Sequence, residues 1–249
     1  MVLLSTDSLK GYGLSRIFRF AKEVGFDGIE VALDLHLFDT QNAEYLNELQ
    51  KEHGLKIRVV RTFRNSTVKQ SSLALEIAQD VGAKMVILDP PKIFDFTYKS
   101  WLKKEVPKLR KKYQLDIALK NGGSEYTLGF IPGRSMTSVA DLQNFEQVCL
   151  DISNLYGKNQ DLMRVYDVLK PHLKHVHLSN VDKGKEGSML DKGIMPLESF
   201  LTKLKGDQYK GDVSLVVRPR ALGVGDDRIM MRSLEKSLGF VKKYMSGRL

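Results

Sequence analysis

Cysteine is almost absent from this chain. Cys149 is the only one in 249 residues, so the chain cannot form an internal disulfide or a site that needs several thiolates. Apolar runs are short, and none approaches the roughly 20 residues that cross a membrane. Residues 1–7 show no basic leader followed by a long apolar segment, which argues against a signal peptide. These absences predict a soluble, cytoplasmic protein.

The balance of charge is basic, with 39 Lys and Arg against 30 Asp and Glu and a net charge of +9. In the densest basic stretch, residues 99–112, lysines alternate with apolar residues such as Trp101 and Leu109. That pattern places the charges on the solvated face of a helix. We therefore do not expect nucleic acid as a partner, and the sequence leaves a homo-oligomer open.

Short apolar runs alternate with longer segments of helical period along the whole chain. Runs rich in Val, Ile and Leu are typical of parallel strands buried on both faces. Three helical segments stop at Gly25, Gly54 and Gly82, the residue type that tolerates a left-handed cap. Pro107 is predicted to kink or divide the basic helix. The eight strand candidates are residues 2–5, 27–33, 55–61, 84–88, 115–119, 147–152, 174–179 and 213–218.

Eight such repeats predict an α/β fold with a single domain over residues 1–249, a closed (β/α)8 TIM barrel. Strands that are joined by right-handed helical crossovers lie parallel, and about 250 residues is an ordinary size for this barrel. An open nucleotide-binding sheet is the alternative, but residues 11–16 lack the last glycine of its Gly-x-Gly-x-x-Gly turn. In a barrel, chemistry is expected at the carboxyl ends of the strands.

Polar side chains stand at most of these strand ends. His175 and His177 share one face of the seventh strand, because side chains alternate along a strand. The sequence does not decide whether Glu30 faces the barrel lumen or the helices, or whether Asp89 is a site residue or a turn former. The candidates at the strand ends are Glu30, Asp34, His36, Arg61, Arg64, Asp89, Lys120, Asn121, Asp151, Asn154, His175, His177, Asn180, Arg218 and Arg220.

Several segments resemble the sugar phosphate isomerase/epimerase family, which shares the xylose isomerase-like barrel with the apurinic endonucleases. They are Leu-Ser-Thr at residues 4–6, Ala-Lys-Glu-Val-Gly-Phe-Asp-Gly-Ile-Glu at 21–30 and His-Val-His-Leu-Ser-Asn at 175–180. Residues 209–215 resemble the last strand of that family. The likeness spans nearly the whole chain and is loose between residues 120 and 146.

The resemblance implies a divalent metal bound by Glu, Asp, His and Glu on strands five to eight. In this sequence those positions fall on Lys120, Asp151, His177 and Val216, so two of the four can be ligands. Their charges sum to zero where the family pattern gives about −3, and an ammonium would repel a dication. A further His and Asp common in the family are replaced by Asn154 and Asn180. We therefore expect a degenerate metal site, without a bound metal and without another cofactor.

An anion could take the place of the metal, because Arg and Lys side chains bind phosphate and carboxylate groups. The first hypothesis is a metal-independent isomerase or epimerase that acts on a small anionic sugar or sugar phosphate. Glu30 or Asp151 would be the base, and His177 and Lys120 would stabilise the enediolate oxygen. The expected ligand-binding residues are Arg61, Arg64, Asn154, Asn180, Arg218 and Arg220.

Other hypotheses remain beside this one. Lys120 could form a Schiff base with the substrate. The barrel could instead be non-catalytic and bind an anionic metabolite or a partner protein, with Lys120 and Asp151 neutralising each other. An endonuclease-like role on abasic DNA is disfavoured, because most ligands of the metal cluster in those enzymes are missing.

Overall fold

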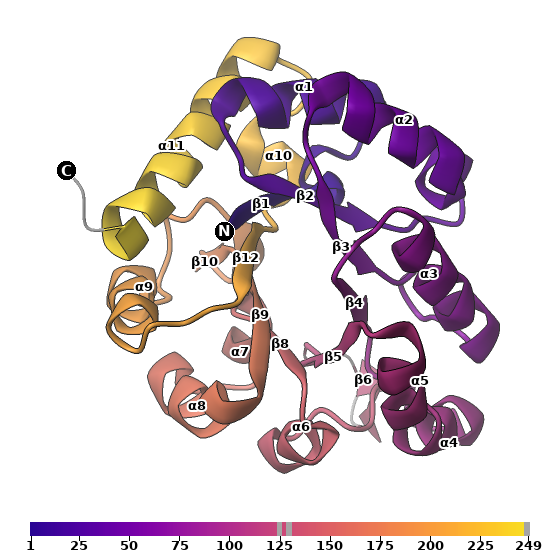
Figure 1. The fold of residues 1–249 in the computed structure, drawn as a ribbon. Helices are drawn as coiled ribbons and strands as arrows, with labels where there is room; N and C mark the ends of the chain where they lie inside the picture. Colours follow the sequence, from indigo (N-terminus) through magenta and orange to yellow (C-terminus); the bar gives the residue numbers. More distant parts are fainter. Residues whose placement is uncertain (124–125, 128–130, 247–249) are drawn as a thin grey trace.

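Eight parallel strands close into a barrel in the computed structural model, which describes residues 1–123, 126–127 and 131–246 (Figure 1). The strands overlap all eight predicted ranges, with bounds that differ by at most three residues, which confirms the single-domain TIM barrel. The strands, in their order around the barrel, are β1 (Val2–Ser5), β12 (Asp212–Leu215), β9 (Leu173–Leu178), β8 (Val148–Asp151), β5 (Asp116–Lys120), β4 (Met85–Leu88), β3 (Ile57–Arg61) and β2 (Gly28–Ala32).

Helices cover the outside of the barrel (Figure 1). The three glycines that were predicted to end helices all have positive φ, +89° at Gly25, +60° at Gly54 and +70° at Gly82. The basic segment is divided next to Pro107, as its sequence predicted. The helices are α1 (Leu14–Val24), α2 (Ala43–His53), α3 (Val68–Asp80), α4 (Phe96–Lys104), α5 (Val106–Tyr113), α6 (Val139–Phe145), α7 (Ser153–Tyr156), α8 (Leu162–Leu169), α9 (Leu197–Gly206), α10 (Pro219–Leu222) and α11 (Asp227–Ser246).

Alternation along the strands divides the core into two parts. One set of side chains packs between the strands and the helices, and Ile29 and Val31 of β2 belong to it. A smaller cluster fills the lumen of the barrel and includes Leu3 and Cys149. Because Glu30 lies between Ile29 and Val31, its side chain must point the other way, into the lumen. The buried His175 and His177 take the same inward positions on β9.

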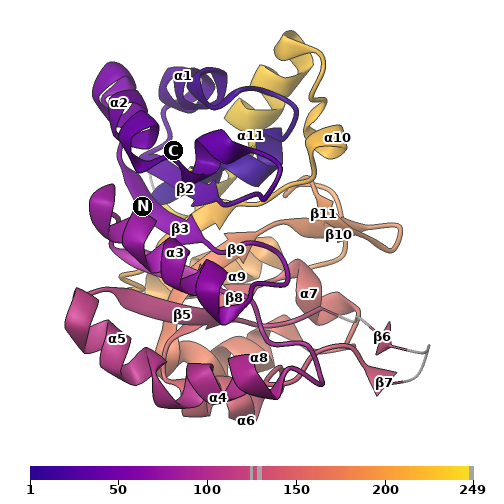
Figure 2. The same ribbon diagram turned by 90° about the vertical axis from the view of Figure 1, so that its right-hand side faces the viewer.

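Two short hairpins lie on the same side of the barrel, β6 (Tyr126–Thr127) with β7 (Ile131–Pro132) and β10 (Asn180–Asp182) with β11 (Lys185–Ser188) (Figure 2). The second was not predicted. Lys183 and Gly184 join its strands with φ of +49° and +72°, the signs that a type I′ turn requires. The glycines of residues 122–146 predict a long loop followed by a short helix near residues 139–145; α6 is that helix, and part of the loop, including Gly129, lies outside the described residues. No helix in residues 1–123 or 131–246 combines the length and the apolar character needed to cross a membrane.

Candidate active site at the barrel mouth

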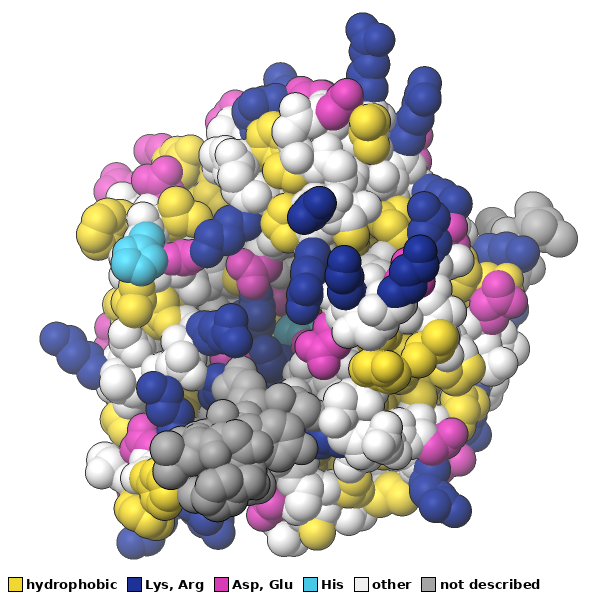
Figure 3. Space-filling view, turned by 180° about the vertical axis from the view of Figure 1, so that it is seen from behind, with side chains coloured by type: hydrophobic (Ala, Val, Ile, Leu, Met, Phe, Trp, Pro, Cys, Tyr) yellow, Lys and Arg dark blue, Asp and Glu magenta, His cyan; other side chains and the backbone are white. Residues whose placement is uncertain are grey.

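A cavity of about 670 Å³ opens at the carboxyl ends of the strands. Figure 3 shows this face of the molecule, where basic and acidic side chains gather around a hollow. Of the residues that the sequence singled out, Lys120, Asp151, Arg61, Arg64, Asn154 and Arg218 line the cavity. Asp89 and His36 line it as well. Asp89 is therefore a residue of the site and not only a turn former.

Lys120 is paired with Asp89 across the ends of β5 and β4. Its Nζ lies 2.7 Å from Asp89 Oδ1, and the side chains of Lys120 and Asp89 are only 12% and 9% exposed. Burial lowers the pKa of Lys120, but the charge of Asp89, the hydrogen bond to it and the charge of Asp151 together outweigh that effect and raise the pKa above its ordinary value. Lys120 therefore remains an ammonium at neutral pH. This pairing replaces the expected neutralisation of Lys120 by Asp151, although Asp151 contributes a weaker attraction.

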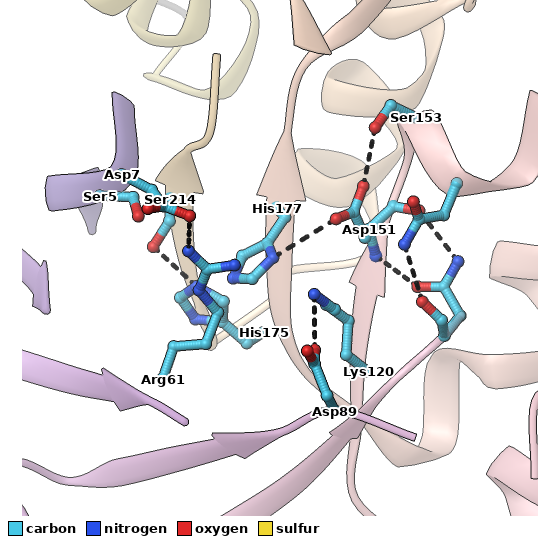
Figure 4. A network of polar contacts seen from close by, with 12 residues as sticks. Ser5, Asp7, Arg61, Asp89, Lys120, Asp151, Ser153, His175, His177 and Ser214 are labelled. Atoms are coloured by element: carbon cyan, nitrogen blue, oxygen red, sulfur yellow. Dashed lines mark hydrogen bonds and ion pairs between the residues drawn. The ribbon is translucent and has the colours of Figure 1, made fainter. Parts of the chain in front are cut away.

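Asp151, His177 and Glu30 connect the cavity to the lumen, and Figure 4 shows Asp151 beside His177. Asp151 Oδ2 lies 3.7 Å from His177 Nδ1, and His177 Nε2 donates to Glu30 Oε2 at 3.0 Å. Burial raises the pKa of Asp151, but the contacts with His177 and Lys120 outweigh it and lower that pKa below its ordinary value. Asp151 is therefore ionised where it faces the cavity.

Glu30 is fully buried and bound on both carboxylate oxygens. Ser5 Oγ donates to Oε1 at 3.0 Å, and Arg61 Nε lies 3.4 Å from the same oxygen. Burial raises the pKa of Glu30, but the charge of His177 and hydrogen bonds from His175 and His177 lower it well below its ordinary value. Arg61 also pairs with Asp7, from the short helix after β1. Asp7, Arg61, Glu30, His177 and Asp151 thus form a row in which acidic and basic groups alternate.

Glu30, His175 and His177 could hold a metal ion together. One ligand atom from each lies within 4.8 Å of the others, and all three side chains are fully buried. His175 Nε2 lies 3.4 Å from Glu30 Oε2 and 2.8 Å from Ser214 Oγ. Two imidazoles and a carboxylate are a ligand set that proteins use for zinc and other divalent transition metals.

Two of the predicted ligand-binding residues lie away from the cavity lining. The side chain of Asn180 is buried in the β10 region, where its Nδ2 donates to Leu190 O at 3.0 Å and its Oδ1 accepts from two backbone N–H groups. Arg220 lies exposed on α10. Of the other predicted residues, Asn154 donates to the carbonyl of Asn121 at 2.8 Å while it faces the cavity.

The comparisons with known proteins agree with this architecture. The family model described as the xylose isomerase-like TIM barrel matches residues 18–234. The chain belongs to the xylose isomerase-like TIM barrel family. No curated protein sequence is significantly similar to it.

Solved structures of this barrel family share the fold at low identity. A D-tagatose 3-epimerase-like protein is 17% identical with a TM-score of 0.73, over 99% of this chain and 98% of that one. D-psicose 3-epimerase with D-tagatose from Clostridium cellulolyticum H10 is 12% identical with a TM-score of 0.75, over 98% and 99%. An AP endonuclease of family 2 from Brucella melitensis is 15% identical with a TM-score of 0.72, over 98% of both chains.

The expectation that this barrel lacks a divalent-metal site is wrong. The four positions inferred from the family resemblance do not form one, because Lys120 and Val216 offer no ligand. The group Glu30, His175 and His177 does offer a possible site, deeper in the lumen. Around this group, Asp7 and Glu30 both pair with the guanidinium of Arg61, and Asp151 lies beside His177.

Sequence reasoning missed Asp7, Lys10 and the β11 residues Glu186 and Gly187 as parts of the cavity wall. Asp7 could have been found, because Thr6-Asp7 directly follows the first strand. The β11 residues could not be placed before the hairpin was known. Gly187 has φ of +72°, and a Cβ there would lie 2.7 Å from Arg218 Cγ, so a glycine is needed where Arg218 crosses the hairpin.

Proposed function

We propose that this barrel is an isomerase or epimerase that moves a proton at the carbon next to the carbonyl of a small sugar. One observation carries the proposal. The ionised carboxylate of Asp151 and the ammonium of Lys120 line the same cavity from the neighbouring strands β8 and β5. Removal of such a proton needs a base and a positive group for the oxygen that becomes negative. The two residues supply one group of each kind.

Each of the two residues is held in place by a partner. Ser153 Oγ donates to Asp151 Oδ1 at 3.0 Å, which leaves Oδ2 toward His177. Asp89 fixes the ammonium of Lys120 and keeps it charged. We infer that Asp151 accepts the proton and that Lys120 stabilises the enediolate oxygen. A charged Lys120 is a poor nucleophile, so we do not infer a Schiff base.

The size of the cavity supports a substrate as small as a monosaccharide, since ligand pockets commonly measure about 300 to 1,000 Å³. Two structures with the same fold are described as a 3-epimerase with D-tagatose and a D-tagatose 3-epimerase-like protein, which favours a ketose. A divalent ion bound by Glu30, His175 and His177 would supply a Lewis acid beneath the cavity.

Arg218 indicates a further property of the substrate. Its guanidinium lines the cavity, and the described residues offer it no acidic partner, whereas Lys10, Arg61 and Lys120 each pair with an aspartate. An unpaired arginine at a cavity wall binds phosphate or carboxylate in bidentate fashion. We infer that the sugar carries an acidic group that lies against Arg218.

The test is turnover of ketoses, including D-tagatose, and of their phosphates, followed by NMR of the products. We expect conversion to an isomer or epimer, and we expect Asp151→Asn to lower kcat by at least about 100-fold, as loss of a general base typically does. Arg218→Ala should raise KM for the phosphates and leave kcat nearly unchanged. Arg220→Ala, on an arginine outside the cavity, is the matched control.

Two results would contradict the proposal. One is the absence of conversion of every sugar in the panel by the metal-supplemented protein. The other is conversion that survives unchanged in Asp151→Asn, because a base that can be removed without effect does not carry the reaction. Equal KM changes in Arg218→Ala and Arg220→Ala would refute the acidic-group inference alone.

A further inference from the structure

We propose that Glu30, His175 and His177 form a zinc-type site inside the lumen, which shares His177 with the strand-end site that the family resemblance implies but takes its other two ligands from Glu30 and His175. Glu30 reaches it from β2, while both histidines come from β9, on the other side of β1 and β12. The proposal does not depend on the sugar chemistry, because it concerns only what these three side chains bind.

The spacing of the donor atoms fits a tetrahedral ion. Glu30 Oε2 lies 3.0 Å from His177 Nε2 and 3.4 Å from His175 Nε2. Ligand atoms at about 2 Å from a tetrahedral zinc ion lie about 3.3 Å from one another. The two imidazole nitrogens lie within 4.8 Å of each other, so side-chain adjustments would bring the three atoms around an ion.

The donor types select the class of metal. Two neutral imidazole nitrogens and one carboxylate oxygen are common ligands of zinc, whereas magnesium and calcium are bound mainly by oxygen atoms. Three protein ligands leave a fourth position for another donor. Ser214 does not fill this position; its Oγ lies 2.8 Å from His175 Nε2 and so competes with an ion for that nitrogen.

The surrounding charges favour a dication. Asp7 and Glu30 share the guanidinium of Arg61, and Asp151 lies 3.7 Å from His177 Nδ1, so these three carboxylates and one guanidinium leave two negative charges when His177 is neutral. Buried charges are costly unless they are compensated. A divalent ion would bring the sum to zero.

The outer contacts of the group also match those of a metal site. With an ion on Nε2, His177 would carry its proton on Nδ1, which faces Asp151 Oδ2 at 3.7 Å. Metal-binding histidines commonly direct their second nitrogen at a carboxylate in this manner. Arg61 and Asp151 both touch the group and line the cavity, so the ion would enter from the mouth past these two side chains.

The experiment measures metal binding directly. The protein is stripped with a chelator, and Zn²⁺ and then Co²⁺ are titrated by calorimetry and by visible absorption. We expect one equivalent of each, a higher melting temperature with Zn²⁺, and the intense visible bands of four-coordinate Co²⁺. Mg²⁺ should compete weakly. Glu30→Gln, which keeps the shape of the side chain, should weaken Zn²⁺ binding by more than about 100-fold, since even outer partners are worth 10- to 100-fold.

Two further variants test the proposal if Glu30→Gln does not fold well. Ser214→Ala removes the hydroxyl that competes for His175 Nε2, so it should bind Zn²⁺ at least as tightly as the wild type. His172→Gln changes a histidine outside the lumen and should leave the affinity unchanged. Failure of the wild type to bind one equivalent of Zn²⁺, Mg²⁺ binding as tight as Zn²⁺ binding, or a loss in His172→Gln equal to that in Glu30→Gln would overturn the proposal.

Discussion

Removal of the Lys120 charge should destabilise the barrel strongly, because Lys120 and Asp89 form a buried ion pair. At 2.7 Å and an effective dielectric constant of 20, the attraction between two unit charges is about 6 kcal/mol. Desolvation offsets part of it, and breaking one partner of a buried pair costs roughly 3–5 kcal/mol in measured cases. We therefore expect Lys120→Met to lower the free energy of unfolding by about 3–5 kcal/mol.

The assay is urea unfolding of the wild type, Lys120→Met, Asp89→Asn and the double variant. The double variant should be more stable than Lys120→Met alone, because it leaves no unpaired carboxylate in the cavity wall. A loss below about 1 kcal/mol in Lys120→Met, or strict additivity of the two single changes, would refute the reasoning.

The same pair predicts a dependence on pH. Burial raises the pKa of Asp89, but the charge and hydrogen bond of Lys120, with the charges of Arg61 and Arg134, together outweigh that effect and lower the pKa below its ordinary value. Its contribution to stability is therefore complete above the pKa of an unfolded aspartate, about 3.9, and is lost as the pH falls through the lower folded-state value. Asp89→Asn should lose this part of the acid dependence. An unchanged acid profile in that variant would contradict the assignment.

The remaining predictions concern single sites. Borohydride, which traps a Schiff base, should leave the Lys120 peptide unmodified when it is added with a ketose, because Asp89 keeps the amine protonated. A reduced adduct on this peptide in mass spectrometry would contradict this prediction. Gly187→Ala should raise KM for sugar phosphates by about tenfold and change kcat less, since its Cβ would displace Arg218 and strain a positive φ; an unchanged KM would count against the role of Arg218. Cys149 is fully buried, so iodoacetamide should label it only in urea, and labelling of the native protein would argue against this burial.

The fold could be predicted because its signals are local and repeated. Buried parallel strands read as short apolar runs, and glycines mark where helices end, so eight repeats follow from the sequence alone. The β10–β11 hairpin was missed, although Gly184 gave a turn signal, because Lys183 is an uncommon residue at a position with positive φ.

The site could be predicted only in part, because its contacts join strands far apart in the chain. Which way Glu30 points depends on the alternation of β2 within the closed barrel, and its partner His177 lies 147 residues away. The partner of Lys120 depends on register, which sets Leu88 opposite Leu119 and so brings Asp89 beside Lys120. Comparison of single positions with the family pattern found His177 but not the group around it, and the expected loss of the metal site followed from that omission.

Proton exchange tests the central claim most directly. The protein is incubated in D₂O with D-tagatose and with ketose phosphates, and the recovered sugars are analysed by mass spectrometry and NMR. The account predicts deuterium at the carbon next to the carbonyl with the wild type and little or none with Asp151→Asn. Sugars recovered without deuterium from the wild type, or with equal labelling by Asp151→Asn, would contradict it.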